Sequence, residues 1–251
     1  MPRIALVGAS GRMGQAIAAL AESEGAVLVG GVERDGAVTG AADLPALAAA
    51  CDVLIDFSVP DALEATLAAA EASGTAVLVG TTGLTAAHRA RIETAAARIA
   101  VLQTANTSLG VTLLRRLVAQ AARALGPDWD IEIVEMHHRH KRDAPSGTAL
   151  LLGAAANRGR GAASDDALNR LDRMGPGASM RAEGDIHYAS LRGGSVAGDH
   201  QVVFAGEGER IELGHRAEGR ATFARGALAA ARWLAGRAPG CYTMDDVLGL
   251  A

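Results

Sequence analysis

Cysteine, lysine and long apolar runs are scarce in this 251-residue chain. Its two cysteines, Cys51 and Cys241, form no CxxC or metal-ligand pattern, so we expect no disulfide framework and a reducing, cytoplasmic location. No stretch approaches the roughly 18 apolar residues that a membrane-spanning helix needs. The apolar run Ile4–Val7 is also too short for the core of a signal peptide. The sequence therefore predicts a protein without a membrane segment.

A surplus of basic residues is also missing. The chain has 24 lysines and arginines against 28 aspartates and glutamates, a formal net charge of −4. Proteins that bind nucleic acids or anionic membranes normally carry a basic surplus, so we expect neither as a partner. Hydrophobic residues make up 49% of the chain and charged residues 21%, which excludes wholesale disorder.

Lys141 is the single lysine, and every other basic residue is arginine. Arginine can supply positive charge, whereas lysine is a compact ammonium that gives up its proton more readily. A single lysine in a chain that otherwise uses arginine indicates a position that needs a titratable ammonium. The alternative is the chance survival of a surface residue.

The first half of the chain alternates short apolar runs with alanine-rich segments of helical length. The apolar runs are Ile4–Val7, Val27–Val32, Val53–Phe57, Ala76–Val79 and Ile99–Leu102. The helical segments are Met13–Glu24, Asp61–Ser73 and Thr85–Arg98. This alternation predicts an α/β fold with a Rossmann-type, doubly wound parallel sheet. Because the runs are continuous, we expect these strands to be buried on both faces.

The pattern changes after residue 107. The remaining elements that we expect are the helix Leu109–Leu125, the strand Asp130–Met136, an exposed connection over 157–182, the strands Ile186–Leu191, Gln201–Ala205 and Arg210–Gly214, and the helix Thr222–Leu234. These strands have the period of a sheet with one open face. We therefore expect a dinucleotide-binding domain over 1–107, completed by 218–251. Residues 108–217 would form a smaller α+β domain with an open mixed sheet.

A glycine-rich turn joins the first expected strand to the first expected helix. It reads Gly8, Ala9, Ser10, Gly11, Arg12, Met13, Gly14. Such a turn lets backbone N–H groups approach a pyrophosphate at the helix start, and Glu33 after the second strand would bind ribose hydroxyls. Glu33 favours NADH, whereas Arg12 and Arg34 could pair with the 2′-phosphate of NADPH, so both cofactors stay open. The alternative is a glycine turn without a ligand.

Two later loops also follow the carboxyl ends of expected strands, where ligands bind in such sheets. The first loop is Gly80, Thr81, Thr82 and Gly83, and the second is Thr104, Ala105, Asn106 and Thr107. We expect both to contact the nicotinamide side of the cofactor, although ordinary helix caps would have a similar pattern.

The third cluster is a histidine loop with His137, His138, His140 and Lys141. The helix start that follows, residues 145–148, has free N–H groups that suit a carboxylate or phosphate. Imidazoles and an ammonium beside such an end indicate acid–base chemistry on an anionic substrate. A metal site is an alternative, but no HExxH or cysteine pattern supports it, and we expect no metal. A solvated basic turn is the second alternative.

With both loops in view, the chain closely resembles the 4-hydroxy-tetrahydrodipicolinate reductase family over nearly its whole length. The most specific match is residues 132–149, and the glycine turn and the loop at residues 80–83 match the family's cofactor loops. The resemblance implies NADH- or NADPH-dependent reduction of a cyclic imine dicarboxylate in lysine and diaminopimelate biosynthesis. It also implies a cytoplasmic homotetramer built through the open sheet of the second domain.

The resemblance further implies roles for individual residues. His137 would be the proton donor and acceptor, and Lys141 the proton donor. His138, Gly147 and Thr148 would hold the substrate's carboxylates. The cofactor residues would be Gly8 to Met13, Glu33, Arg34, Gly80 to Thr82 and Thr104 to Thr107. Thr107 and His187 depart from the family, which usually has a bulkier apolar residue and a glycine there. We expect the domains to close around substrate, with hinges near residues 107 and 217.

Other classes of function remain as alternatives. A related dehydrogenase would act on an amino acid or an aldehyde. A nucleotide sensor would keep the fold and bind a protein partner, but it would have little use for the histidine loop. A hydrolase that held a metal through the histidines would lose activity to chelators.

Overall fold

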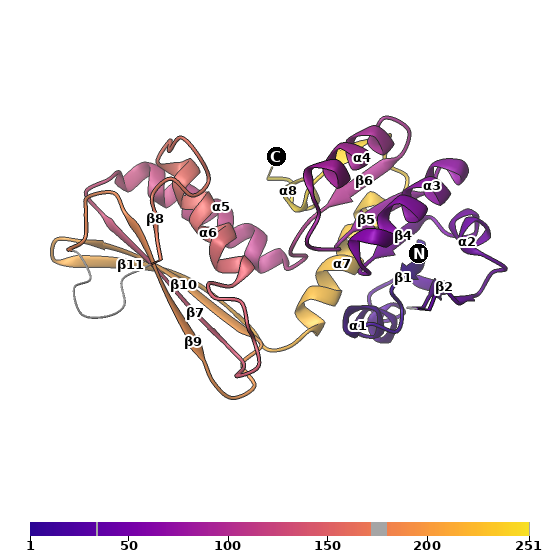
Figure 1. The fold of residues 1–251 in the computed structure, drawn as a ribbon, viewed down its shortest axis with the longest axis horizontal. Coiled ribbons are helices and arrows are strands. Elements are labelled where there is room, and N and C mark those ends of the chain that lie inside the picture. The colour runs from indigo at the N-terminus through magenta and orange to yellow at the C-terminus, as the bar shows by residue number, and fades with distance from the viewer. Residues whose placement is uncertain (34, 172–179, 251) are drawn as a thin grey trace. The chain divides into compact units, whose positions relative to one another are not determined.

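The chain folds into two compact units (Figure 1). The computed structural model describes residues 1–33, 35–171 and 180–250, so the predicted cofactor residue Arg34 lies outside the described residues. Residues 1–109 and 220–251 form the first unit, and residues 110–219 form the second.

The first unit is built on a seven-stranded sheet. Its strands are β1 (Arg3–Val7), β2 (Val27–Val32), β3 (Val38–Thr39), β4 (Val53–Asp56), β5 (Ala76–Val79), β6 (Ala100–Gln103) and β12 (Gly240–Tyr242). Their order is β12-β6-β5-β4-β1-β2-β3, and every pair is parallel except β2–β3. The predicted doubly wound parallel sheet is confirmed.

Helices cover both faces of this sheet. One face carries α1 (Arg12–Leu20), α7 (Ala221–Leu234) and α8 (Met244–Val247), and the other carries α2 (Leu44–Ala50), α3 (Leu63–Ser73) and α4 (Ala86–Ala96). A 3-10 turn, η1 (Pro60–Ala62), precedes α3. Successive residues of β1 supply the two cores, because side chains alternate across a strand: Ile4 and Leu6 face α1 and α7, and Ala5 and Val7 face α2 and α3.

The expectation of burial on both faces is wrong for β2. Val27 is 45% exposed and Leu28 39% exposed, whereas every residue of β4 and β5 is buried. The reason is position, since only the two-residue strand β3 lies beyond β2 in the sheet. The sequence also gave no sign of α2, β3 or β12, which are too short for a periodic pattern.

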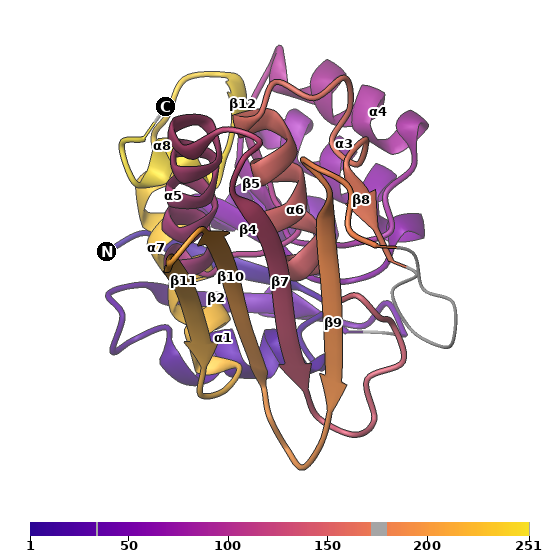
Figure 2. The ribbon, with the colours of Figure 1, turned by 90° about the vertical axis from the view of Figure 1, so that its left-hand side faces the viewer.

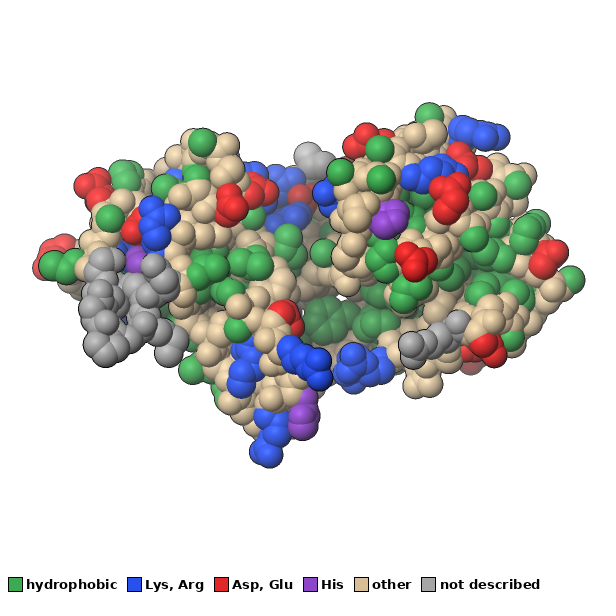
Figure 3. Space-filling model, viewed as in Figure 1, with side chains coloured by type: hydrophobic (Ala, Val, Ile, Leu, Met, Phe, Trp, Pro, Cys, Tyr) green, Lys and Arg blue, Asp and Glu red, His purple; other side chains and the backbone are tan. Residues whose placement is uncertain are grey.

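Charges of both signs are interspersed over the part of the first unit that Figure 3 displays. On the helices of this unit, Arg91 of α4 forms ion pairs with Glu64 and Glu71 of α3. Within the described residues, no helix combines the length and the apolar character needed to cross a bilayer.

The second unit contains a mixed five-stranded sheet with helices on one face, as predicted. The strand order is β11 (Glu209–Ala217), β10 (Gly198–Gly206), β7 (Asp130–His137), β9 (Ile186–Arg192) and β8 (Asn169–Arg170). Strand β10 is antiparallel to both of its neighbours, whereas β9 is parallel to β7 and β8. The helices α5 (Leu109–Leu125) and α6 (Gly147–Gly159) lie behind this sheet in Figure 2.

The predicted exposed connection over 157–182 is only partly correct. Asn157 is fully buried, and its side-chain amide donates to the carbonyl of Gly153 and to Oδ1 of Asn169. Asn169 belongs to β8, which adds an edge to the sheet. Residues 172–179 lie outside the described residues. The segment contains the last residues of α6 and strand β8, and the pairing of β8 with β9 leaves no periodic pattern in the sequence.

The register of the second sheet places ionisable groups at one end of the core. On the face of β7 that α6 covers, Ile131 and Ile133 are followed by Glu135 and His137. Directly across the β7–β10 pair, Ile131 faces Phe204, Ile133 faces Val202 and Glu135 faces His200. The same row of side chains therefore changes from apolar to ionisable toward the end of β7.

Candidate active site

The glycine turn of the first unit is packed tightly against the neighbouring strands. The N–H groups of Gly8 and Ala9 both donate to the carbonyl of Val32 at the end of β2 (3.0 Å each). Gly8 has φ +85°, and a Cβ there would lie 2.8 Å from the carbonyl oxygen of Phe57. A Cβ on Gly14 would lie 2.4 Å from two carbonyl oxygens of the turn. Glycine is needed at both positions for the turn to close.

Helix α1 begins directly after this turn. Its N-cap is Gly11, so no side chain accepts a hydrogen bond from the first turn of the helix. Such an end presents free N–H groups and a partial positive charge, which suits a pyrophosphate. Glu33 follows β2, which the turn contacts. The turn therefore has the form that dinucleotide binding requires.

A hollow of about 360 Å³ lies at the carboxyl ends of the first unit's strands. Eight predicted cofactor residues line it: Arg12, Met13, Gly80, Thr81, Thr82, Ala105, Asn106 and Thr107. Gly8, Ala9, Ser10, Gly11, Glu33 and Thr104 are not among its lining residues. Three lining residues were missed: Phe57, Ser58 and Phe223. The first two follow β4, so the strand-end rule that selected the other loops could have found them.

Asp56 joins two of the loops that line this hollow. The residue is fully buried at the end of β4, and its Oδ1 accepts hydrogen bonds from Ser58 N (2.9 Å), Ser58 Oγ (2.5 Å) and Thr81 Oγ1 (2.9 Å). Burial raises the pKa of Asp56, and the hydrogen bonds from Ser58 and Thr81 oppose that rise. The carboxyl group thus fixes the loop after β5 to the loop after β4.

The loop after β6 is braced by its own polar groups. Thr104 Oγ1 donates to the carbonyl of Asn106 (2.8 Å), and Asn106 Oδ1 accepts from Ser108 N (2.8 Å). Thr107 is buried and donates from Oγ1 to the carbonyl of Phe223 (2.7 Å). The threonine therefore ties this loop to the first turn of α7.

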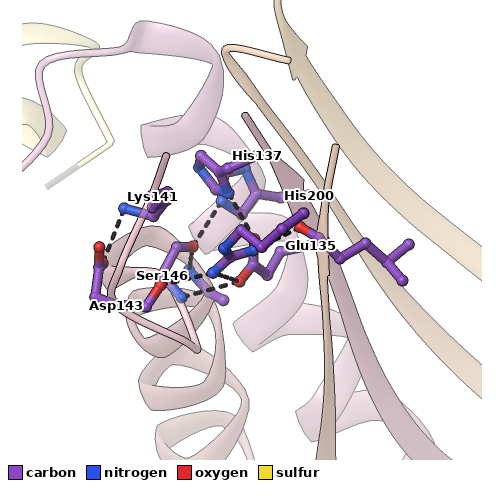
Figure 4. Close-up of polar contacts among 9 residues, drawn as sticks. Glu135, His137, Lys141, Asp143, Ser146 and His200 are labelled. Atoms are coloured by element: carbon purple, nitrogen blue, oxygen red, sulfur yellow. Dashed lines mark hydrogen bonds and ion pairs between the residues drawn. The ribbon is translucent and has the colours of Figure 1, made fainter. Parts of the chain in front are cut away.

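In the second unit, Glu135 collects hydrogen bonds from three separate segments (Figure 4). Its Oε2 lies 2.5 Å from His137 Nδ1. Arg192 on β9 donates from Nη1 to Oε2 (2.9 Å) and from Nη2 to Oε1 (2.8 Å). The N–H of Ser146, the N-cap of α6, donates to Oε1 (3.2 Å). Only 1% of the Glu135 side chain is exposed.

Glu135 is ionised in this setting. Burial alone would raise its pKa, but hydrogen bonds from Arg192, Ser190 and His137, with the charge of Arg192, lower the pKa to about 2. An ionised carboxylate only accepts hydrogen bonds, so the proton in the short contact to His137 lies on Nδ1.

His200 lies beside this pair. Its Nε2 is 3.0 Å from Ser146 Oγ, which also accepts from Ala149 N, and its ring meets that of His137 edge to face at 5.0 Å. Burial, and then the neighbouring His137, lower the pKa of His200 to about 4. His200 is therefore neutral at pH 7.

The other predicted residues of the second unit lie on the loop before α6 and at its start. Lys141 Nζ forms an ion pair with Asp143 Oδ2 (2.8 Å), and its N–H donates to the carbonyl of His138. The carbonyl of Asp143 accepts a hydrogen bond from Arg192. Gly147 is the first residue of α6, and a Cβ there would meet no atom within 4 Å. The first residue of α6 therefore has open space on its side-chain side.

Among the described residues, no three or more His, Cys, Asp or Glu side chains are placed to hold a metal ion. His137 contacts the carboxylate of Glu135, and His200 on β10 contacts the hydroxyl of Ser146. The residues that sequence reasoning missed in this unit are Glu135, Arg192 and His200, whereas Ser146 belongs to the predicted helix start at residues 145–148. Arg192 and His200 carry no local signal, because only the register of β9 and β10 brings them to β7.

Comparison with known proteins covers both units. Residues 2–107 match the family model for the N-terminus of dihydrodipicolinate reductase, and residues 110–248 match the model for its C-terminus. The chain is 59% identical over 249 residues to 4-hydroxy-tetrahydrodipicolinate reductase of Zymomonas mobilis, covering 99% of this chain and 97% of that protein. It is 50% identical to the reductase of the same name from Parvibaculum lavamentivorans, covering 99% and 98%.

A solved structure has the same fold. Dipicolinate-bound dihydrodipicolinate reductase from Paenisporosarcina sp. TG-14 matches with a TM-score of 0.77 at 22% identity, covering 97% of each chain. The dinucleotide-type turn and the family matches together define a pyridine-nucleotide-dependent oxidoreductase. The chain belongs to the dihydrodipicolinate reductase family, which confirms the resemblance seen in the sequence.

Replacing Asp56 tests its role in the cofactor hollow. In Asp56→Ala, Ser58 and Thr81 lose their shared acceptor, and we expect the dissociation constant for NADH to rise about five- to tenfold, because a typical hydrogen bond contributes roughly 0.5–1.5 kcal/mol. Fluorescence titration of the nucleotide measures this constant. Asp52→Ala is the matched control, since Asp52 forms an exposed ion pair with Arg3. Equal dissociation constants for the two variants would contradict the role of Asp56.

The lowered pKa of His200 predicts a pH-dependent stability. An unfolded chain binds a proton on this histidine near its ordinary value of 6.5, whereas the folded chain binds it only near 4. Stability should therefore fall as the pH drops from about 6.5 to about 4. In His200→Gln we expect the melting temperature to depend less on pH in this window, as followed by calorimetry. His140→Gln, at an exposed position, is the control and should show the same dependence of the melting temperature on pH as wild type. If His200→Gln also showed the wild-type dependence, the interpretation of His200 would be wrong.

Proposed function

We propose that this protein reduces 4-hydroxy-tetrahydrodipicolinate to tetrahydrodipicolinate with NADH or NADPH. One hydride and one proton add to the unsaturated ring of a cyclic imine dicarboxylate, and one water leaves. The observation that carries this proposal is the pairing of family models over both halves of the chain with an acid–base cluster beside a helix start. The product belongs to lysine and diaminopimelate biosynthesis.

We assign cofactor binding to the first unit. A turn that needs glycine at Gly8 and Gly14, an uncapped start of α1 and the hollow beside it suit a nicotinamide dinucleotide. Gly8 to Met13 would surround the pyrophosphate, Glu33 the adenosine ribose, and the loops at residues 80–82 and 104–107 the nicotinamide. The bound cofactor supplies the hydride, and the protein supplies position, charge and a proton.

We assign substrate binding and proton transfer to the second unit. His137 and Lys141 would stabilise the negative charge that develops as hydride arrives, and would then deliver the proton. His138, Gly147 and Thr148 would hold the two carboxylates. The support is the start of α6, where a Cβ on Gly147 would meet open space and Ser146 N donates to the Glu135 carboxylate that contacts His137.

Glu33 and Arg12 bear on the choice between the two cofactors. Glu33 would accept hydrogen bonds from the ribose hydroxyls of NADH and would repel a 2′-phosphate. Arg12, exposed and lining the hollow, could pair with that phosphate. We propose that both cofactors are used, in a cytoplasmic enzyme.

We further propose that the protein is a homotetramer assembled through the open face of the second unit's sheet. No helix of the described part of this unit covers that face (Figure 2). Val134 and Met136 on β7 and the half-exposed Leu191 on β9 line a shallow hollow of about 450 Å³ there. Covering these apolar side chains with a second copy would remove them from water.

A coupled assay tests the reaction. The imine is generated in situ from pyruvate and aspartate semialdehyde by the preceding synthase, and cofactor absorbance is followed with NADH and NADPH separately. We expect oxidation of the cofactor only when the imine is present. In Arg12→Ala we expect kcat/KM to fall for NADPH more than for NADH. No oxidation by folded protein that binds cofactor would rule out this substrate.

Variants in the same assay test the two proton donors. We expect kcat to fall about 10²–10⁴-fold in His137→Gln, the range of general acid–base catalysis. Lys141→Arg should also lower kcat although it keeps the charge, because a guanidinium does not release its proton. His140→Gln is the matched control and should retain wild-type kcat. A wild-type kcat in the double variant His137→Gln with Lys141→Ala would show that the assigned roles are wrong.

Light scattering tests the tetramer. We expect the wild-type protein to have four times the 25.5 kDa mass of the chain. In Leu191→Glu a charge on the open face should give a smaller species, because burying an unpaired charge at an interface is costly. Leu117→Glu, at an exposed position on α5, should keep the wild-type mass. A wild-type mass of one chain would contradict the assembly.

A further inference from the structure

Glu135 and His137 form a carboxylate–imidazole pair that resembles the base-orienting pairs of other enzymes. They are two positions apart on β7, so both side chains lie on the face that α6 covers. The 2.5 Å contact joins Oε2 to Nδ1, which leaves Nε2 as the other nitrogen of the ring. In catalytic triads a buried carboxylate likewise fixes the tautomer of the histidine that moves the proton.

The carboxylate is itself held in place from two sides. Arg192 binds both of its oxygens, and Ser146 N donates to Oε1 (Figure 4). Each oxygen of Glu135 therefore has at least two donors: Oε1 receives Arg192 Nη2 and Ser146 N, and Oε2 receives Arg192 Nη1 and His137 Nδ1. With four donors directed at it, the carboxylate has a single orientation that serves all of them.

The surroundings of the second nitrogen fit a proton-exchanging role. A Cβ on Gly198 would lie 3.0 Å from Nε2 of His137 and 3.4 Å from the His200 ring. The absent side chain leaves that space open next to Nε2. His200, the other imidazole in contact, is neutral at pH 7 and is engaged with Ser146. Because Nδ1 is committed to Glu135, Nε2 is the nitrogen available for exchange.

We propose that Glu135 is the positioning residue of this enzyme's proton donor. It holds a proton on Nδ1 of His137, so that Nε2 is the atom that exchanges a proton with the substrate. The inference rests on the proposed function for the identity of the substrate. The state of the His137–Glu135 pair is a property of the folded protein without substrate.

Glu135→Gln discriminates this role from a merely structural one. If the amide oxygen takes the place of Oε1, it still accepts from Arg192 and Ser146, and the amide NH₂ faces His137 Nδ1 and one Arg192 nitrogen. The opposite orientation would place the NH₂ against both Arg192 and Ser146 N. The first orientation has fewer donor–donor contacts, and in it the amide donates to Nδ1. The variant should therefore shift His137 to the tautomer with its proton on Nε2.

Two measurements on the intact protein test the proposal. Nitrogen-15 NMR of histidine-labelled protein at a pH where the ring is neutral reports which nitrogen of His137 carries the proton. We expect Nδ1 in wild type and Nε2 in Glu135→Gln. In the coupled assay we expect kcat of the variant to fall at least about 100-fold, with the KM for the nicotinamide cofactor unchanged. Glu135→Asp, which keeps a carboxylate, should retain the wild-type tautomer and recover part of kcat.

Glu132→Gln is the matched control, since Glu132 lies on the same strand on the other face and pairs with Arg181. It should leave both the tautomer and kcat as in wild type. A wild-type His137 with its proton on Nε2 would overturn the proposal without any variant. A lower kcat in Glu135→Gln with an unchanged tautomer would assign Glu135 a structural role and would also overturn it. If wild type gives no imine-dependent oxidation, the proposed function fails, while the NMR result still decides the state of the pair.

Discussion

The ionised carboxylate of Glu135 is the interaction on which the second unit's site depends. Three segments donate hydrogen bonds to it: the end of β7, the start of α6 that follows a short loop, and the end of β9, which is 57 residues away in the sequence. A buried charge is tolerated only when its hydrogen bonds are satisfied, and here four donors satisfy two oxygens. The same bonds that stabilise the charge also position His137 and the helix start.

The first unit also has a buried carboxyl group near the carboxyl end of a strand, Asp56, but its pKa shifts in the opposite direction to that of Glu135. Asp56 ends β4 and joins the loops around the cofactor hollow, but all of its hydrogen-bond donors are neutral. Burial therefore raises its pKa. Glu135 has the guanidinium of Arg192 beside it, and its pKa falls to about 2. One group organises loops, whereas the other supplies a fixed negative charge to an imidazole.

The two candidate sites follow different rules of construction. In the parallel sheet of the first unit, the loops after successive strands meet at one edge. Locating the strands in the sequence therefore already identifies the loops that converge. In the mixed sheet of the second unit, the site lies within the alternation of β7, where Glu135 and His137 continue the row that Ile131 and Ile133 begin. The position of the loops therefore indicates the cofactor site, whereas the register of the strands is needed to find the site around His137.

The sequence by itself determined the parallel sheet, the glycine turn and the histidine loop, because each depends on residues that are neighbours in the chain. Family membership was visible in the same segments. The sequence-based prediction was wrong for β2, whose exposure depends on its place near the sheet edge, and for the segment after Asn157, where β8 pairs with β9. Only the tertiary structure brought Arg192 and His200 to His137, because pairing between strands, rather than any local pattern, sets which side chains meet.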